Sequence, residues 1–186
     1  MTFDDNLLEL CKKGDRAAQE KLYRLYSPVM LGICLRYAKN RHEAEDIMQE
    51  GFIKVFTNLS GFRGEGSFEG WIKRIMVNTS LNNYYKAKKT ITDKNFDDIR
   101  ETEIVNEDDS IQDLKYSQSE MLEAIQQLPE GYKQVFNMYV FEKYKHREIA
   151  DLLDISVNTS KSQLSKARTH LKNTLLQLNK DKKQSK

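Results

Sequence analysis

The residues best suited to binding chemistry lie in residues 61–85, where glycines, aromatic rings and basic side chains alternate. Four of the chain's eight glycines fall in the first ten of these residues, and they are interleaved with Phe62, Phe68 and Trp71. Glycine lets a backbone approach a ligand closely, while aromatic and arginine planes stack on unpaired bases. The stretch therefore predicts binding of single-stranded nucleic acid.

Two other interpretations compete for the same residues. A phosphate-cradling loop needs a preceding strand or a GK[ST] sequence, and the GxG in residues 62–67 has neither, so a nucleotide-binding fingerprint is unsupported. Core packing is the alternative for the three aromatic rings, and for Trp71 we prefer it.

A second candidate surface lies on the predicted final helix, which we expect to be capped by Asn158 and to end near Gln177. Leucines and Ala167 at helical spacing predict its core face. Residues 155–179 contain Lys and Arg but no acid. Lysines attract phosphates, and short polar side chains let a helix approach a groove closely. The opposite face carries Asn158, Thr159, Ser162, Ser165, Lys166, Thr169 and Asn173.

The segment before this helix completes the outline of a DNA-binding unit. A short helix is predicted from about Lys145 to Leu153, followed by the turn at residues 154–157. Helix, short turn and helix favour a recognition helix that reads base edges from its N-terminal half. A solvated amphipathic helix is the alternative.

A third surface is predicted on the helix of residues 41–59, which precedes the glycine-rich loop (60–66) and a helix from Ser67 to about Lys86. Its apolar residues recur at three- and four-residue spacing and predict one core-facing side. On the opposite side a helical wheel groups two acids, an amide and an isoleucine, which indicates a docking surface. These residues are Asp46, Gln49, Glu50 and Ile53.

The remaining reactive residues predict no catalytic, metal or cofactor site. His42, His146 and His170 are scattered, and each is expected to be a solvated helix residue. Cys11 and Cys34 lie on separate apolar faces and are expected to be buried thiols. The acidic N-terminus and the absence of a long apolar run predict no signal peptide and no membrane insertion, so a cytoplasmic protein is expected.

Composition and patterning predict an all-α protein of two small helical domains. The chain holds 186 residues with only two prolines, and apolar residues recur at helical rather than alternating spacing. Residues 1–89 hold 15 Lys/Arg against 11 Asp/Glu, residues 90–117 hold 3 against 9, and residues 118–186 hold 12 against 8. Two basic blocks around an acidic strip are typical of two polyanion-binding modules, although surface charge that merely scatters remains the alternative.

These patterns predict the domain limits. Residues 1–89 should form an N-terminal helical bundle, with Pro28 kinking or dividing one helix. Residues 90–117 should form a flexible acidic linker, because they are too polar to offset the entropy of ordering. Residues 118–180 should form the helix-turn-helix domain, and residues 181–186 a basic tail that frays.

Several motifs in this order resemble the extracytoplasmic-function sigma factors of bacterial RNA polymerase. The first runs from Ala44 to Glu50 (AEDIMQE), with Phe52, Val55 and Phe56 behind it. The glycine-rich FRGEGSF follows, and then Trp71-Ile72-x-Arg74-Ile75-x-x-Asn78. Near the C-terminus stand Leu128-Pro129, Glu148-Ile149-Ala150 and TSKSxLxKAR at residues 159–168. The resemblance covers nearly the whole chain except the linker.

The resemblance implies an initiation factor, without enzymatic activity or cofactor, that binds core RNA polymerase and promoter DNA and that an anti-sigma factor restrains. It implies that Asp46, Gln49, Glu50 and Ile53 dock on the clamp helices of the largest polymerase subunit. It implies that the minus-ten element is recognised and melted as single strands, with a base captured in a pocket, by Phe62, Arg63, Gly64, Glu65, Ser67, Phe68, Trp71, Arg74, Asn78, Asn82 and Tyr85. It implies that the minus-thirty-five element is read as duplex DNA by Asn158, Thr159, Lys161, Ser162, Ser165, Lys166, Arg168 and Thr169.

Three positions depart from the family's pattern. Asn82 and Tyr85 stand where the family often has an acid and an arginine. Ser160 replaces a usual valine on the inward side of the recognition helix, which predicts looser packing, and Lys145 replaces a serine-type cap, which predicts a weaker helix start. Two other functions remain open: an independent helix-turn-helix regulator that leaves strands closed, and a polymerase-binding inhibitor that supports no transcription.

Overall fold

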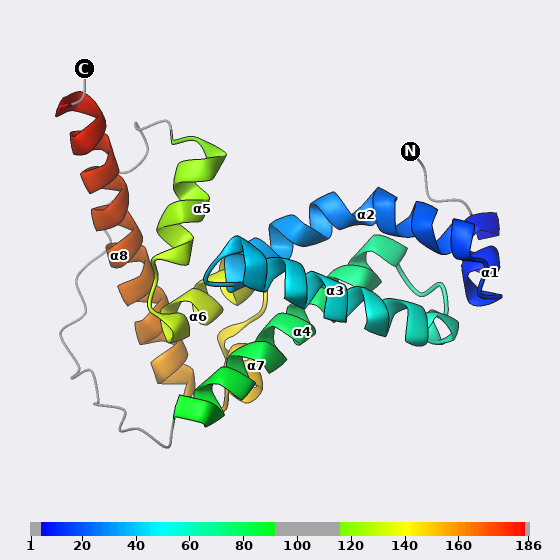
Figure 1. Ribbon diagram of the computed structural model, residues 1–186. Coiled ribbons are helices and arrows are strands. Elements are labelled where there is room, and N and C mark those ends of the chain that lie inside the picture. Colours follow the sequence, from blue (N-terminus) through cyan, green and yellow to red (C-terminus); the bar gives the residue numbers. More distant parts are fainter. Residues whose placement is uncertain (1–4, 92–115, 185–186) are drawn as a thin grey trace. The chain divides into compact units, whose positions relative to one another are not determined.

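The computed structural model describes residues 5–91 and 116–184, and every element in these two segments is helical (Figure 1). The chain divides into two compact units, one for each segment. The predicted all-α fold is confirmed. The elements are α1 (Asp5–Lys12), α2 (Arg16–Tyr37), α3 (Arg41–Thr57), the short 3-10 helix η1 (Leu59–Gly61), α4 (Phe68–Ile91), α5 (Gln118–Gln126), α6 (Glu130–Val140), α7 (His146–Leu153) and α8 (Val157–Gln184).

The N-terminal unit is a bundle in which α2, α3 and α4 pack against one another and α1 packs on α2. The Asp15 carboxylate caps α2 by accepting from the Ala18 N–H at 2.7 Å, and the Asn40 side chain caps α3 by accepting from the Glu43 N–H at 2.9 Å. The core side chains include Leu22, Met30, Val55, Ile72 and Met76, each fully buried. The core-facing side predicted for residues 41–59 is therefore part of this core.

Of the two outcomes predicted for Pro28, a kinked or a divided helix, division is wrong, because α2 runs without interruption from Arg16 to Tyr37. Proline lacks the N–H that would bond the carbonyl four residues earlier. Here both Pro28 and Arg24, which supplies that carbonyl, are exposed. Water can satisfy the carbonyl, so the helix continues.

The helices that flank the glycine-rich loop end differently from the prediction. α3 ends at Thr57 and passes into η1, and α4 begins at Phe68 with the Ser67 hydroxyl accepting from the Gly70 N–H at 3.0 Å. α4 then continues to Ile91, past the predicted domain limit at residue 89. Residues 92–115, most of the predicted linker, lie outside the described residues.

Gly51 of α3 lies in close contact with Met76 of α4. A Cβ built on Gly51 would lie 2.9 Å from the Met76 Cε and closer still to its Sδ. Met76 is fully buried, so its side chain has little room to move. Gly32, in the middle of α2, has no such neighbour within 4 Å.

Alanine at these two glycines is expected to change stability in opposite directions. Gly32→Ala should raise the free energy of unfolding of the N-terminal unit by about 0.5–1 kcal/mol, because alanine costs less backbone entropy in a helix. Gly51→Ala has the same entropic advantage but overpacks the core, so it should lower the free energy of unfolding by about 1–2 kcal/mol. Urea unfolding of the two variants measures the sign of each change in the free energy of unfolding. Equal stabilisation by the two substitutions would show that Met76 yields freely.

The C-terminal unit packs α5, α6 and α7 against the long α8. Ser117 and Glu120 form a reciprocal capping box at the start of α5. The turn after α7 places Asp154 in the left-handed region (φ 51°). The Ser156 hydroxyl then accepts from the Thr159 N–H at 2.9 Å and starts α8 at Val157.

Two details of the predicted final helix are therefore wrong. Ser156, rather than Asn158, caps it, because the turn before the helix is two residues shorter than predicted. The helix also continues to Gln184 instead of ending near Gln177, so its backbone includes most of the predicted basic tail. The helix-turn-helix outline itself is present.

Both cysteines are buried, as expected, and neither is in a disulfide. Burial raises the pKa of the Cys34 thiol to about 12, so the thiol is protonated and unreactive near neutral pH. Within residues 5–91 and 116–184, no helix combines the length and the apolar character needed to cross a bilayer.

Candidate functional site

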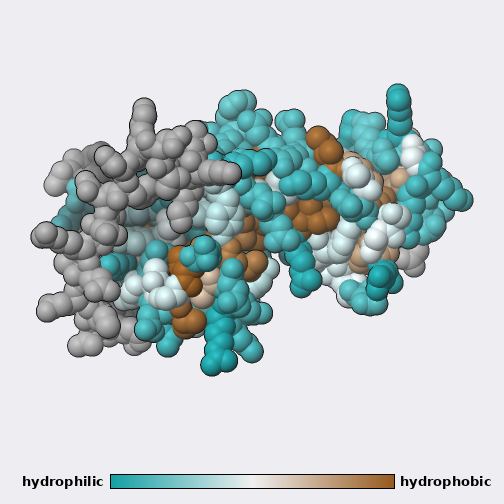
Figure 2. Space-filling model, turned by 90° about the horizontal axis from the view of Figure 1, so that it is seen from below, coloured by the Kyte–Doolittle hydropathy of each residue, from teal (hydrophilic) through white to brown (hydrophobic). Residues whose placement is uncertain are grey.

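The predicted docking face of α3 lies opposite the core. Ile53 is 66% exposed, whereas Ile47 and Val55 of the same helix are buried. Asp46 and Gln49 are also exposed, and Glu50 is half-buried. Apolar patches interrupt a largely hydrophilic surface in Figure 2. Ile53 is the most exposed large apolar side chain in the described residues, ahead of Val29 at 48%, which makes it the candidate centre of a contact surface.

The Glu50 carboxylate is already paired within the unit. It lies 2.7 Å from the Lys54 Nζ on α3 and 3.9 Å from the Lys86 Nζ on α4. The hydrogen bond from Lys54, followed by the charges of Lys54 and Lys86, lowers the pKa of Glu50. Lys54 also donates to the buried Thr79 hydroxyl at 3.2 Å. A partner that binds Glu50 must therefore compete with an existing ion pair.

The three aromatic residues of the glycine-rich stretch form one cluster. Ring centroids are 5.0 Å apart for Phe62 and Phe68, 5.6 Å for Phe62 and Trp71, and 5.7 Å for Phe68 and Trp71. Phe68 is only 3% exposed and also meets Tyr26 of α2 at 5.8 Å. Phe68 is therefore a core residue, whereas the preference for core packing at Trp71 is wrong, because Trp71 is only half-buried at the rim, as is Phe62.

The loop between η1 and α4 depends on its glycines. Gly64 and Gly66 have φ values of 78° and 93°, a region that other residues rarely adopt. Between and around them, Arg63 and Glu65 are exposed. Ser67 is exposed too, although its hydroxyl is engaged in capping α4. The loop therefore presents backbone and charged side chains beside the aromatic cluster.

The predicted residues of α4 form a continuous stripe. Trp71, Arg74, Asn78, Asn82 and Tyr85 follow one another at spacings of three or four, so they lie along one side of the helix. Arg74, Asn78 and Asn82 are exposed, and Tyr85 is half-buried with its ring centroid 5.6 Å from that of Tyr84. The structure thus joins the loop and α4 into one surface with basic, amide and aromatic groups.

The predicted residues of α8 also share one side. Asn158, Lys161, Arg168 and Thr169 are exposed, and Thr159, Ser162, Ser165 and Lys166 are half-buried. Two hydroxyls donate to the helix backbone: Ser162 to the Thr159 carbonyl at 3.0 Å and Thr169 to the Ser165 carbonyl at 3.2 Å. Their oxygens keep lone pairs that can accept hydrogen bonds from a ligand.

One polar pair in this unit was missed by the sequence analysis. The His146 Nδ1 lies 2.9 Å from the Ser160 hydroxyl, and its ring stacks on Tyr139 with centroids 4.7 Å apart. The expectation that His146 is a solvated helix residue is wrong, because the ring is half-buried between α6 and α8. Burial, followed by the charges of Lys161 and Arg168, lowers its pKa.

Lys145 starts α7 without a side-chain cap. Its backbone N–H instead donates to the Glu148 carboxylate at 2.7 Å, which supplies half of a capping box. The predicted loss at this helix start is therefore partly offset by Glu148, the acidic residue of the Glu148-Ile149-Ala150 motif.

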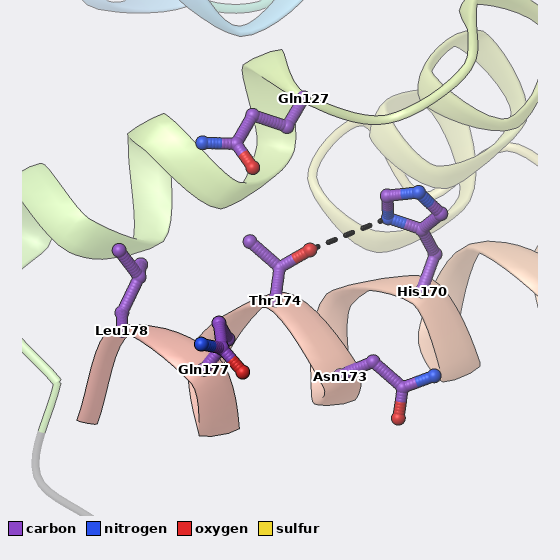
Figure 3. Close-up of a pocket in the computed structure, with 6 residues that line it drawn as sticks. All are labelled: Gln127, His170, Asn173, Thr174, Gln177 and Leu178. Atoms are coloured by element: carbon purple, nitrogen blue, oxygen red, sulfur yellow. Dashed lines mark hydrogen bonds between the residues drawn. The ribbon is translucent and has the colours of Figure 1, made fainter. Parts of the chain in front are cut away.

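A groove of about 500 Å³ lies between the end of α5 and the C-terminal half of α8 (Figure 3). Gln127 lines one side, and the other side is lined by His170, Asn173, Thr174, Gln177 and Leu178. The Thr174 hydroxyl oxygen lies 3.4 Å from the His170 Nδ1. Asn173 belongs to the predicted polar face of this helix, whereas the eight residues predicted to contact the minus-thirty-five element lie elsewhere on α8. Within the two described segments, no three His, Cys, Asp or Glu residues lie close enough together to hold a metal ion.

Known protein families match each of the two units, and known relatives align with nearly the whole chain. The family model for Sigma-70 region 2 matches residues 22–90, and that for Sigma-70, region 4 matches residues 118–171. The ECF RNA polymerase sigma-E factor of Haemophilus influenzae is 30% identical over 182 residues, which cover 92% of this chain and 95% of the relative. The ECF RNA polymerase sigma factor SigW of Bacillus subtilis is 30% identical over 179 residues, which cover 90% and 94%.

The chain belongs to the extracytoplasmic-function (ECF) sigma factors. As an ECF sigma factor it is a regulatory, DNA-binding protein that recognises promoters and initiates transcription with RNA polymerase. The sigma factor RpoE of Bartonella quintana, solved with the anti-sigma factor NepR, shares the fold at a TM-score of 0.51 and 16% identity. That match covers 84% of this chain and 95% of RpoE.

Proposed function

We propose that this ECF sigma factor docks on core RNA polymerase through Asp46, Gln49, Glu50 and Ile53 of α3. The observation that carries the proposal is the 66% exposure of Ile53 on a helix whose other side is core. Its proposed partner is the pair of clamp helices on the largest polymerase subunit. An apolar centre ringed by polar groups suits a stable protein interface.

We propose that the loop and the α4 stripe bind the minus-ten element as single strands and so open it. The half-buried rings of Phe62 and Trp71 offer stacking surfaces beside exposed Arg63 and Arg74. Gly64, Glu65 and Ser67 bring the loop backbone close to the strand, and Asn78, Asn82 and Tyr85 continue the contact along α4. Phe68 contributes by positioning this surface, since its own ring is buried.

We propose that α8 reads the minus-thirty-five element in the major groove with Asn158, Thr159, Lys161, Ser162, Ser165, Lys166, Arg168 and Thr169. Support comes from the position of these residues on one side of α8, which is the second helix of the helix-turn-helix. The corresponding functional regions are residues 1–89 and 118–180, with residues 90–117 as the linker that threads through polymerase.

Lys166→Ala is expected to weaken binding of the holoenzyme to minus-thirty-five duplexes of every sequence and to reduce the salt slope by about 1, because one phosphate contact is lost. Fluorescence anisotropy across a salt series measures the slope. Lys180→Ala is the matched control, because Lys180 lies about 20 Å further along the same helix. An unchanged slope for Lys166→Ala would make this lysine a solvated residue without a DNA contact.

We further propose that the protein acts in the bacterial cytoplasm, performs no chemistry itself and is held inactive by an anti-sigma factor. Support for the last point is the solved relative of the same fold, RpoE, which is bound to one. The relevant enzyme is the polymerase, to which the sigma factor brings promoter choice and strand opening.

Run-off transcription with core polymerase over a random promoter library tests the proposed function. Transcripts should start downstream of two enriched elements, and permanganate should react with thymines in the upstream edge of the opened minus-ten region. Binding of duplex DNA without polymerase and without strand opening would identify an independent regulator instead. Binding of core without any transcript would identify an inhibitor.

A further inference from the structure

The polar pair of His146 and Ser160 joins the two helices of the helix-turn-helix. His146 is the first residue of α7, and Ser160 lies in the first turn of α8 with no exposed surface. The 2.9 Å contact between Nδ1 and the hydroxyl gives the buried serine a partner on the preceding helix. The Tyr139 ring of α6 stacks on the His146 imidazole and so helps to hold it in place.

This contact lies directly beneath the proposed DNA-reading surface. Thr159, Lys161 and Ser162 adjoin Ser160 in the same turn and belong to the proposed contact set. A rotation of this turn would move all three side chains relative to the base edges. A hydrogen bond is directional and limits such a rotation, whereas an apolar side chain at the same place contributes packing with a weaker angular preference.

We propose that His146 and Ser160 are positioning residues that set the specificity of minus-thirty-five recognition. The proposal rests on the proposed reading role of α8. The pair fixes the first turn of the recognition helix and contacts no DNA itself. Its loss should therefore reduce discrimination between promoter sequences and leave the phosphate-driven affinity for any duplex unchanged.

The charge of His146 adds a second signature. The groups facing it are Tyr139 of α6 and Lys161 and Arg168 of α8. Burial and the two cations hold its pKa below the ordinary 6.5, so the neutral imidazole is the form built into the junction. As pH falls from 6.5 towards the lowered pKa, the stabilisation from the neutral form is lost. Discrimination by α8 should weaken over that range.

The test uses holoenzyme assembled from the full chain and core polymerase. Promoter fragments carry a common minus-ten element and either the minus-thirty-five element selected from a library or a scrambled one. The ratio of the two dissociation constants isolates discrimination by α8. The variants are Ser160→Val and Ser160→Thr, which have nearly the same shape and differ in the hydroxyl, and His146→Phe, which keeps a stacking ring without nitrogens.

Ser160→Thr should keep the ratio, while Ser160→Val and His146→Phe should each lower it about tenfold, the effect of losing one hydrogen bond of about 1.4 kcal/mol. The double variant should lose no more than either single one. Binding to the scrambled fragment should not change. In the parent protein the ratio should fall as the pH drops below 6.5, a fall that His146→Phe abolishes and His170→Gln preserves.

Equal ratios for Ser160→Val and Ser160→Thr, or an unchanged ratio for His146→Phe, overturn the positioning role. Circular dichroism melts accompany each variant, and if Ser160→Val does not fold, His146→Phe decides the question alone. A parent holoenzyme that does not distinguish the selected element from the scrambled one instead refutes the reading role of α8.

Discussion

Ile53→Glu is expected to lower the affinity of this sigma factor for core RNA polymerase by a factor of about 100 or more, because it removes the apolar centre of the proposed docking face and brings an unpaired charge into the interface. The side chain is 66% exposed in the free protein, so the substitution removes almost no internal packing. Thermal unfolding should therefore change little. Affinity for core polymerase can be measured by anisotropy of a labelled sigma factor, with circular dichroism to monitor the fold.

Val29→Glu is the matched control for this experiment. Val29 is 48% exposed on α2 of the same bundle and lies outside the proposed docking face. It should leave polymerase affinity within about twofold, as surface substitutions away from an interface usually do. Equal losses for the two variants, or none for Ile53→Glu, would remove the docking role of α3.

Ile53 gives a sharper test than Glu50, although charge reversal at Glu50 is the more obvious choice from the sequence. Glu50→Lys would place a third cation beside Lys54 and Lys86 and would disturb the junction of α3 and α4. A loss of binding would then combine two causes. Asp46→Lys, at an exposed position whose carboxylate lies 3.8 Å from the His42 imidazole, is a cleaner charge reversal.

Phe68→Ala should cause the largest loss of stability, about 3–5 kcal/mol for the N-terminal unit, because it empties a buried site among Tyr26, Phe62 and Trp71. The unit should then unfold at a much lower urea concentration. Strand opening should be lost as a consequence of this unfolding rather than of a missing base contact. Urea titration followed by Trp71 fluorescence measures the change.

Two further variants separate packing from DNA contact. Phe68→Leu should retain most of the stability and also most of the promoter opening, because it keeps the core filled. Phe62→Ala should destabilise less than Phe68→Ala, because Phe62 is half-buried, yet reduce opening in a chain that stays folded. Promoter opening lost by Phe68→Leu at unchanged stability would show that the Phe68 ring itself contacts a base.

The elements of this fold could be predicted where local signals agree. The start of α3 at Arg41 and its core-facing side follow from the spacing of its apolar residues alone. Local rules failed where exposure decided the outcome. Pro28 has no N–H to donate to the carbonyl of Arg24, but both residues are exposed, and α2 continues through them.

The candidate surfaces could be predicted as faces but not as networks. Periodicity places Glu50 and Ile53 on one side of α3, yet only tertiary packing brings Lys86 to the same carboxylate. The same limit applies to His146, which meets Ser160 fourteen residues later in the chain through the helix-turn-helix turn. The glycine-aromatic pattern also could not tell that Phe68 is core and Phe62 is rim.

The pairing of Glu50 with Lys54 has a consequence for how the holoenzyme responds to salt. In the proposed docking, a polymerase cation that binds Glu50 would replace Lys54, so docking should gain little net electrostatic energy and depend mainly on the apolar contact of Ile53. Promoter binding instead releases counterions from DNA and weakens steeply as salt rises. With increasing salt, promoter DNA should therefore dissociate first, while the sigma factor remains bound to polymerase and ready to rebind when the ionic strength falls.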